Sequence, residues 1–173
     1  MTSTAVDMSD IILQADASGA PYRLEHVRGR LKVEASPASR HQMTAKEIEA
    51  SLRPLEGTTS GCACYSLQDV LIRFPDRDRS LKRPDIAVFC EKPPKSDEAL
   101  NVLPDAVIEI ISLSYEEKDL GEDGAPFYLA CGVRDVIIVD PRAGTARHYR
   151  PGRTDMLATP ARIDLSCGCQ VEV

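Results

Sequence analysis

The sequence lacks any uninterrupted apolar run of about 18 residues, which is the length that a membrane-spanning helix needs. Its first ten residues, MTSTAVDMSD, lack the basic and apolar regions of a secretory signal. We therefore expect a cytoplasmic protein that does not enter the membrane. In a reducing cytoplasm, the six cysteines are expected to be thiols or metal ligands rather than disulfides.

The sequence also lacks an excess of basic residues. It has 21 Lys and Arg against 27 Asp and Glu, for a net charge of -6, which argues against tight non-specific binding to nucleic acid. The negative charge is concentrated in residues 97–123, which hold nine acids and a single lysine, Lys118. Such a segment indicates either a cation site beside a polyanion or a solvated loop, and for a bare charge run the loop is favoured.

Three common catalytic signatures are missing as well: a Ser-His-Asp triad, a P-loop and a dinucleotide-binding glycine motif. What is present is an ordinary globular composition, with 43% hydrophobic and 28% charged residues in 173. A chain of this length can bury a core without disulfide staples. We see no repeat or linker, so we expect residues 1–20 to be a lead-in and residues 21–173 to be one domain.

The apolar pattern predicts strands and helices in alternation. Alternating residues around Gly29 predict a β-hairpin, and a one-sided apolar stripe that follows predicts a helix. Short apolar runs further along predict buried strands. The expected elements are a hairpin over 22–35, a helix over 41–55, strands over 63–66, 70–74, 86–90, 106–111 and 135–140, a helix within 114–131, and a hairpin strand over 145–150. This order predicts an α/β or α+β fold, with a central mixed sheet flanked by helices.

Two carboxylates lie within or beside predicted buried strands, where a charged side chain is unusual. Glu109 lies within the apolar run VIEII, where an ionised side chain needs a metal, a basic partner or a raised pKa. Asp85 opens the strand IAVFC. Taken singly, Glu109 could end a strand facing solvent and Asp85 could be an ordinary turn residue. On adjacent strands, the two could converge on Mg²⁺ or Mn²⁺, cations that prefer oxygen ligands.

These residues are part of a longer series in a fixed order. The series comprises Pro84-Asp85, the segment Pro104-Asp105-Ala106-Val107-Ile108-Glu109-Ile110-Ile111-Ser112, Asp119, Tyr128, Gly132-Val133 and Val136-Ile137-Ile138-Val139-Asp140-Pro141. In this order and spacing the chain resembles the Uma2 family, restriction-endonuclease-like proteins of the PD-(D/E)XK nuclease superfamily. The resemblance covers residues 20–165.

The resemblance implies a restriction-endonuclease-like fold and metal-dependent hydrolysis of phosphodiester bonds in DNA. It implies that Asp85, Glu109 and the backbone carbonyl of Ile110 bind Mg²⁺ or Mn²⁺. It also implies a lysine that orients or activates the attacking water. Enzymes of this superfamily that cut duplex DNA commonly act as homodimers, so a homodimer is a further expectation.

The sequence departs from the family pattern at the lysine. The superfamily position two residues after the Glu is Ile111, and the family position four residues after Asp119 is Asp123. In the sequence, the only lysine nearby is Lys118, which becomes the candidate catalytic lysine. We expect Asp123, if it lies near Asp85, to add repulsion that a cation would relieve. The alternative function is a degenerate nuclease fold that has lost catalysis and acts as a nucleic-acid or protein binding module.

The cysteines form two C-x-C pairs, Cys62-Ala63-Cys64 and Cys167-Gly168-Cys169. Four thiolates could hold a structural Zn²⁺, but the pairs are far apart in the sequence and lack the usual C-x₂-C spacing. Small buried side chains are therefore the favoured interpretation of these four, and Cys90 and Cys131 are expected in the core.

One histidine, His41, lies at the expected start of the first helix. It could approach a phosphate or the metal site, but capping or packing is the more common role for such a residue.

Overall fold

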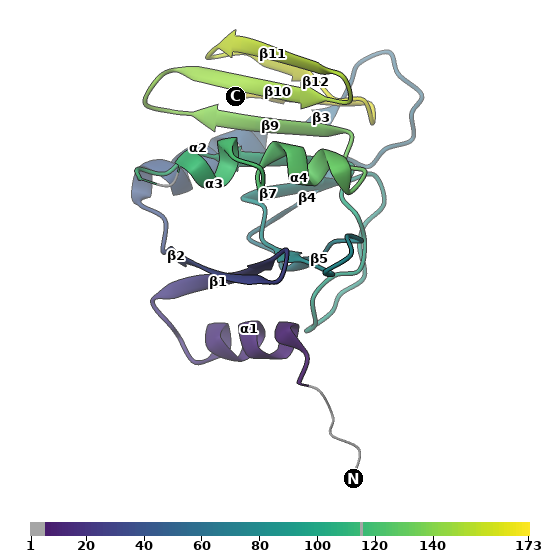
Figure 1. Ribbon diagram of the computed structural model, residues 1–173. Coiled ribbons are helices and arrows are strands. Elements are labelled where there is room, and N and C mark those ends of the chain that lie inside the picture. The colour runs from purple at the N-terminus through teal and green to yellow at the C-terminus, as the bar shows by residue number, and fades with distance from the viewer. Residues whose placement is uncertain (1–5, 115) are drawn as a thin grey trace.

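The computed structural model describes residues 6–114 and 116–173, and its centre is a six-stranded sheet (Figure 1). The strands lie in the order β11-β10-β9-β8-β7-β4. Their bounds are β4 Tyr65–Gln68, β7 Ile86–Phe89, β8 Ala106–Ile110, β9 Asp135–Asp140, β10 Thr145–Arg150 and β11 Arg153–Ala158. Strands β8 and β9 are parallel and the other pairs are antiparallel. The predicted mixed sheet is confirmed.

The central strands are apolar because both faces of the sheet are covered. Every residue of β8 is buried. Ala45 of helix α2, Ser39–Ser51, packs in one apolar cluster with Ile108. On the opposite face, Phe127 of helix α4, Ala125–Ala130, packs in another cluster with Val107. Side chains alternate between faces along a strand, so neighbouring residues of β8 belong to different clusters and Glu109 points toward the α4 side.

A second sheet has the order β2-β1-β6-β5 and carries the predicted N-terminal hairpin. Its strands are β1 Tyr22–Val27, β2 Arg30–Ala35, β5 Ile72–Arg73 and β6 Leu81–Lys82. Arg28 and Gly29 form the turn with positive φ angles of 50° and 76°, as the two-residue turns of hairpins require. The predicted hairpin is confirmed.

The lead-in contains more structure than the sequence indicated. Residues Met8–Ala17 form helix α1, which lies on the outer side of the hairpin (Figure 1). The Asp7 side chain caps this helix by accepting a hydrogen bond from the Ser9 N–H at 2.9 Å. Ile12 is fully buried. No helix in the described residues is long and apolar enough to cross a membrane.

Two further regions differ from the expected elements. A third sheet, β12-β13-β3, joins Arg162–Asp164, Cys169–Glu172 and Arg53–Pro54. Because Arg53–Pro54 pairs with β13, helix α2 ends at Ser51 rather than at residue 55. The sequence predicts one helix within residues 114–131, but two short helices form there, α3 Glu116–Leu120 and α4.

The cysteines differ from the expectation of separate thiols. The structure joins Cys62 to Cys90 and Cys64 to Cys169 as disulfides. Cys131 and Cys167 are free. The prediction of unlinked cysteines is therefore wrong for four of the six, because loops far apart in the sequence meet beside the third sheet.

Candidate active site

Asp85 and Glu109 lie side by side at one end of the central sheet. Strands β7 and β8 pair antiparallel with Ile86 opposite Ile108, so Asp85, one residue before β7, falls opposite Glu109. The Asp85 N–H donates to Glu109 Oε2 at 3.1 Å, and the Ile110 N–H donates to Asp85 Oδ2 at 2.7 Å. The structure thus brings together the two carboxylates and Ile110.

Glu109 is completely buried and is held by a tyrosine. The Tyr128 hydroxyl donates to Glu109 Oε1 at 2.5 Å, and neither residue has any exposed surface. Burial raises the pKa of Glu109 well above its usual value, and the charges of Asp85 and Asp119 raise it further. The pKa of Tyr128 is also raised well above its usual value, by burial and by the Glu109 charge. Tyr128 thus fixes the orientation of Glu109 in addition to packing α4 against the sheet.

His41, at the start of α2, contacts Asp85. Its Nε2 lies 3.0 Å from Asp85 Oδ2. Burial alone would lower the pKa of His41, but the hydrogen bond and charge of Asp85 raise it above its usual value. Burial would raise the pKa of Asp85, but the His41 hydrogen bond and the charges of Lys118 and His41 lower it. The pKa values of the two paired carboxylates are thus shifted in opposite directions, that of Asp85 down and that of Glu109 up.

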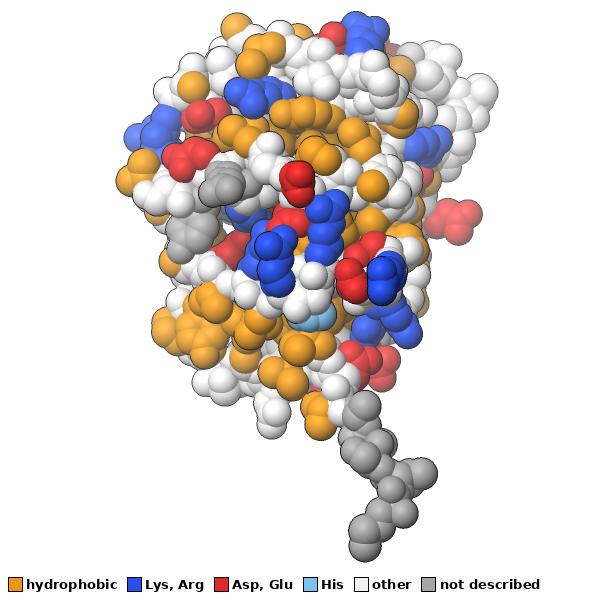
Figure 2. Space-filling model, in the orientation of Figure 1, with side chains coloured by type: hydrophobic (Ala, Val, Ile, Leu, Met, Phe, Trp, Pro, Cys, Tyr) orange, Lys and Arg blue, Asp and Glu red, His pale blue; other side chains and the backbone are white. Residues whose placement is uncertain are grey.

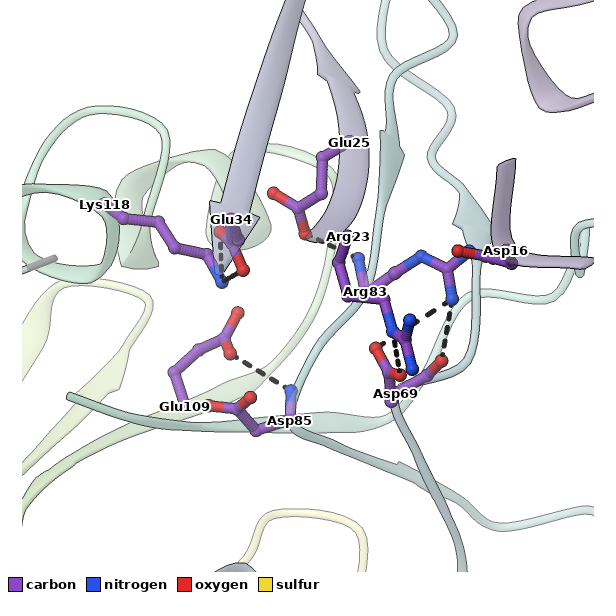
Figure 3. A network of polar contacts seen from close by, with 9 residues as sticks. All are labelled: Asp16, Arg23, Glu25, Glu34, Asp69, Arg83, Asp85, Glu109 and Lys118. Atoms are coloured by element: carbon purple, nitrogen blue, oxygen red, sulfur yellow. Dashed lines mark hydrogen bonds and ion pairs between the residues drawn. The ribbon is translucent and has the colours of Figure 1, made fainter. Parts of the chain in front are cut away.

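Lys118 reaches the same site from α3. Its Nζ forms an ion pair with Glu34 of β2, at 2.8 Å from Oε1, and points toward the space above Glu109 (Figure 3). Burial would lower the pKa of Lys118, but the charges of Glu25, Glu109 and Glu34 raise it well above its usual value. The Lys118 amine therefore stays protonated at neutral pH.

Asp119, the next residue of α3, adds another buried carboxylate. Its side chain is 3% exposed, and its Oδ1 has no hydrogen-bond partner among the described residues. Burial and the charge of Asp85 raise the pKa of Asp119 to about 7. Burial likewise raises the pKa of Glu34. The site thus holds several crowded carboxylates whose repulsion a cation would reduce.

Asp123 does not take part in this crowding. Its carboxylate contacts three basic residues of the hairpin: Lys32 Nζ at 2.5 Å, Arg30 at 3.4 Å and Arg28 at 3.6 Å. Although burial alone would raise it, the pKa of Asp123 is lowered by these contacts, first of all by the Lys32 hydrogen bond. The expected repulsion between Asp123 and the paired carboxylates is therefore wrong.

A second lysine also lies close to the site. Lys82 is 1% exposed, donates to the Asp123 carbonyl oxygen at 2.6 Å, and places its Nζ 4.5 Å from the Tyr128 ring centroid. Lys118 is thus not the only lysine near Glu109. Nothing local marks Lys82, because β6 consists of two residues whose pairing depends on distant strands.

The site opens into a cleft with a volume of about 480 Å³. Asp85, Lys118 and Asp119 contribute to its wall, and the basic residues Arg40 and Arg142 also line it, among apolar and polar residues. In the described part of the chain, Arg40 and Arg142 make no ion pair, which leaves them available for an anion. On the face drawn in Figure 2, acidic and basic side chains are intermingled.

Sequence reasoning missed two of the surrounding acids, Glu25 and Glu34. Glu25 accepts a hydrogen bond from the Arg83 N–H at 2.7 Å and is 1% exposed. A signal was available for Glu25, because it alternates with the buried Val27 on one face of β1. Glu34 carries no such signal, since its partner Lys118 lies 84 residues away.

The protein has a nuclease-like architecture. Its mixed sheet is covered by helices on both faces, and carboxylates converge from adjacent strands beside a lysine. The chain is similar to the crystal structure of a "putative nuclease belonging to DUF820" from Anabaena variabilis. The TM-score is 0.61 and the identity 19%, with 84% of this chain and 83% of that chain covered.

The family follows from the sequence match. The model of the Uma2 family, described as "Putative restriction endonuclease", matches residues 10–166. The chain belongs to this family, and the match begins within α1, inside the segment taken from the sequence as a lead-in. No curated protein matches the chain. The family description supports a nuclease function, and the structural neighbour shows the shared fold.

Proposed function

We propose that the chain is a Mg²⁺- or Mn²⁺-dependent DNA endonuclease that binds its metal through Asp85, Glu109 and the carbonyl oxygen of Ile110. The observation that carries this proposal is the contact between Asp85 and Glu109, 24 residues apart. Asp85 lines a cleft that Lys118 also lines, and Glu109 is buried directly behind it. Family membership supplies the reaction class.

The donor set fits a hard divalent cation. Carboxylate and carbonyl oxygens are the ligands that Mg²⁺ and Mn²⁺ prefer. The buried Asp119 Oδ1, which has no hydrogen-bond partner in the described residues, indicates that the site is short of positive charge. Both Glu109 oxygens accept one hydrogen bond from the protein, and each has a second lone pair available. A bound cation would supply charge stabilisation to the scissile phosphate and lower the pKa of a coordinated water.

The protein's own groups have distinct tasks in this proposal. His41 and the Ile110 N–H fix the orientation of Asp85, and Tyr128 fixes that of Glu109. Lys118 stays protonated, so it orients the attacking water and stabilises negative charge rather than accepting a proton. Arg40 and Arg142 line the cleft where they can bind the phosphates that flank the cleaved bond.

The test combines metal binding with plasmid nicking on the same samples. We expect wild type to bind Mn²⁺ by titration calorimetry and to nick plasmid in its presence, and Asp85→Ala and Glu109→Gln to lose both. Asp97→Ala is the matched control, because Asp97 is exposed in the loop between β7 and β8 and does not line the cleft.

Two results would contradict the proposal. Mn²⁺ binding without nicking would favour the binding-module alternative, in which the fold has kept its metal ligands and lost catalysis. An absence of Mn²⁺ binding in wild type would show that Asp85 and Glu109 are not metal ligands.

A further inference from the structure

A second cluster of potential metal ligands lies away from the carboxylates. Two groups of three potential ligands have their ligand atoms within 4.8 Å of one another in the segments that the structure describes. Both groups consist of cysteines. One group is Cys62, Cys64 and Cys169, and the other is Cys62, Cys90 and Cys167. Cys62 belongs to both, so five sulfurs form one continuous cluster.

Three loops from distant parts of the sequence build this cluster. The Ala63 N–H donates to the Cys90 carbonyl oxygen at 2.9 Å, and the Leu55 N–H donates to the Gly168 carbonyl oxygen at 2.9 Å. Gly168 allows the close approach, because a Cβ at this position would lie 2.2 Å from Ser60 Oγ. These contacts hold residues 60–64 close to residues 167–169.

The arrangement gathers more sulfur than two separate disulfides need. Cys62 Sγ lies 3.4 Å from Cys169 Sγ, although these atoms belong to different disulfides. Cys167, which is free, is buried in the same cluster. Each C-x-C pair contributes both of its sulfurs, as in a chelate.

We propose that the reduced chain binds one structural Zn²⁺ through the thiolates of Cys62, Cys64, Cys169 and a fourth cysteine, either Cys90 or Cys167. In a tetrahedral zinc–thiolate site the sulfurs lie roughly 3.8 Å apart, given Zn–S bonds of about 2.3 Å. The sulfurs of Cys62 and Cys169, 3.4 Å apart, are already close to this spacing. Four protein ligands leave no open position, which makes the site structural rather than catalytic. The disulfide-bonded and zinc-bound forms use the same sulfurs and exclude each other.

The position of the cluster explains what the metal would do. Residues 55–64 form an irregular loop between β3 and β4, and Cys169 opens β13 at the end of the chain. A zinc ion at this point would tie the loop to the third sheet and, with Cys90 as the fourth ligand, also to the end of β7. The site involves neither Asp85 nor Glu109, so it is independent of the proposed nuclease site.

The test is a metal analysis of the full chain purified under reducing, oxygen-free conditions. We expect about one zinc per chain, lost in Cys64→Ser and in Cys169→Ser. Cys131→Ser is the matched control and keeps its zinc, because Cys131 lies outside the cluster. Asp85→Ala and Glu109→Gln also keep their zinc, which separates this site from the carboxylate site. Whichever of Cys90→Ser and Cys167→Ser loses zinc identifies the fourth ligand.

A measurement on wild type guards against variants that fail to fold. Replacing zinc by Co²⁺ in the reduced chain should give the intense visible bands and sulfur-to-metal charge transfer of tetrahedral thiolate coordination. A reduced, folded chain that binds neither Zn²⁺ nor Co²⁺ would overturn the proposal. So would zinc that is lost from Asp85→Ala but retained in Cys64→Ser.

Discussion

Replacing Tyr128 by Phe tests the support of the paired carboxylates directly. The hydroxyl of Tyr128 donates to Glu109 Oε1 at 2.5 Å, and both residues are completely buried. Tyr128→Phe keeps the ring, which packs edge-on against Phe74 at 5.3 Å between centroids. The variant therefore removes one hydrogen bond and leaves the packing in place.

The expected loss follows from that burial. A buried acceptor left without its donor costs about 2 kcal/mol, because water cannot reach Glu109 to replace the hydroxyl. In a chain of this size, that loss lowers the Tm by roughly 4–8 °C. Groups that orient metal ligands typically contribute about 10-fold or more to affinity, so we expect Mn²⁺ binding to weaken by at least that factor.

The assay is urea unfolding of the metal-free protein, followed by Mn²⁺ titration. Tyr149→Phe serves as the control: Tyr149 packs against the same apolar cluster, and its hydroxyl makes no hydrogen bond within the described residues. We expect its stability to change by less than about 0.5 kcal/mol. Equal stabilities for Tyr128→Phe and wild type would show that the Tyr128 hydroxyl does not stabilise buried Glu109.

Two further predictions concern stability. Asp135 is buried, with Oδ1 2.7 Å from His148 Nε2 and Oδ2 accepting from the Ser166 N–H at 2.8 Å; burial would raise its pKa, but these contacts lower it below 3.8. A carboxylate whose pKa is lowered in the folded state stabilises the fold above its unfolded-state pKa, and this stabilisation is lost as the pH falls. In urea unfolding we therefore expect Asp135→Asn to be less stable than wild type by about 2 kcal/mol at pH 7, with the difference closing below about pH 4. A difference that stays constant with pH would contradict this. Gly124→Ala would place a Cβ 1.9 Å from the Asp119 carbonyl oxygen, so we expect it to lower the stability by about 3 kcal/mol in the same assay. The control Gly57→Ala has no such clash, only a positive φ of 76°, and should cost about 1 kcal/mol. Similar losses for the two variants would show that the clash at Gly124 does not decide the cost.

The buried strands and the hairpins follow from local patterns in the amino-acid sequence. The runs IAVF, AVIEI and DVIIVD are apolar enough to require burial on both faces, and each forms a strand close to its expected bounds. The turn at Gly29 marked the first hairpin. The Uma2 resemblance, carried by the order of Asp85, Glu109 and the following motifs, is confirmed by the family match.

Which side chains meet depends instead on how the strands and sheets pair in three dimensions. Asp85 faces Glu109 because β7 pairs antiparallel with β8 in one register, and a shift of one residue would move Glu109 to the opposite face. Lys118 meets Glu34 across 84 residues, and the cysteines of three loops meet beside the third sheet. Such contacts leave no local pattern, because they depend on the pairing of strands far apart in the chain. A residue's own neighbours in the sequence set its burial and conformation, whereas the partners of its charged or sulfur atoms are set by how the sheets assemble.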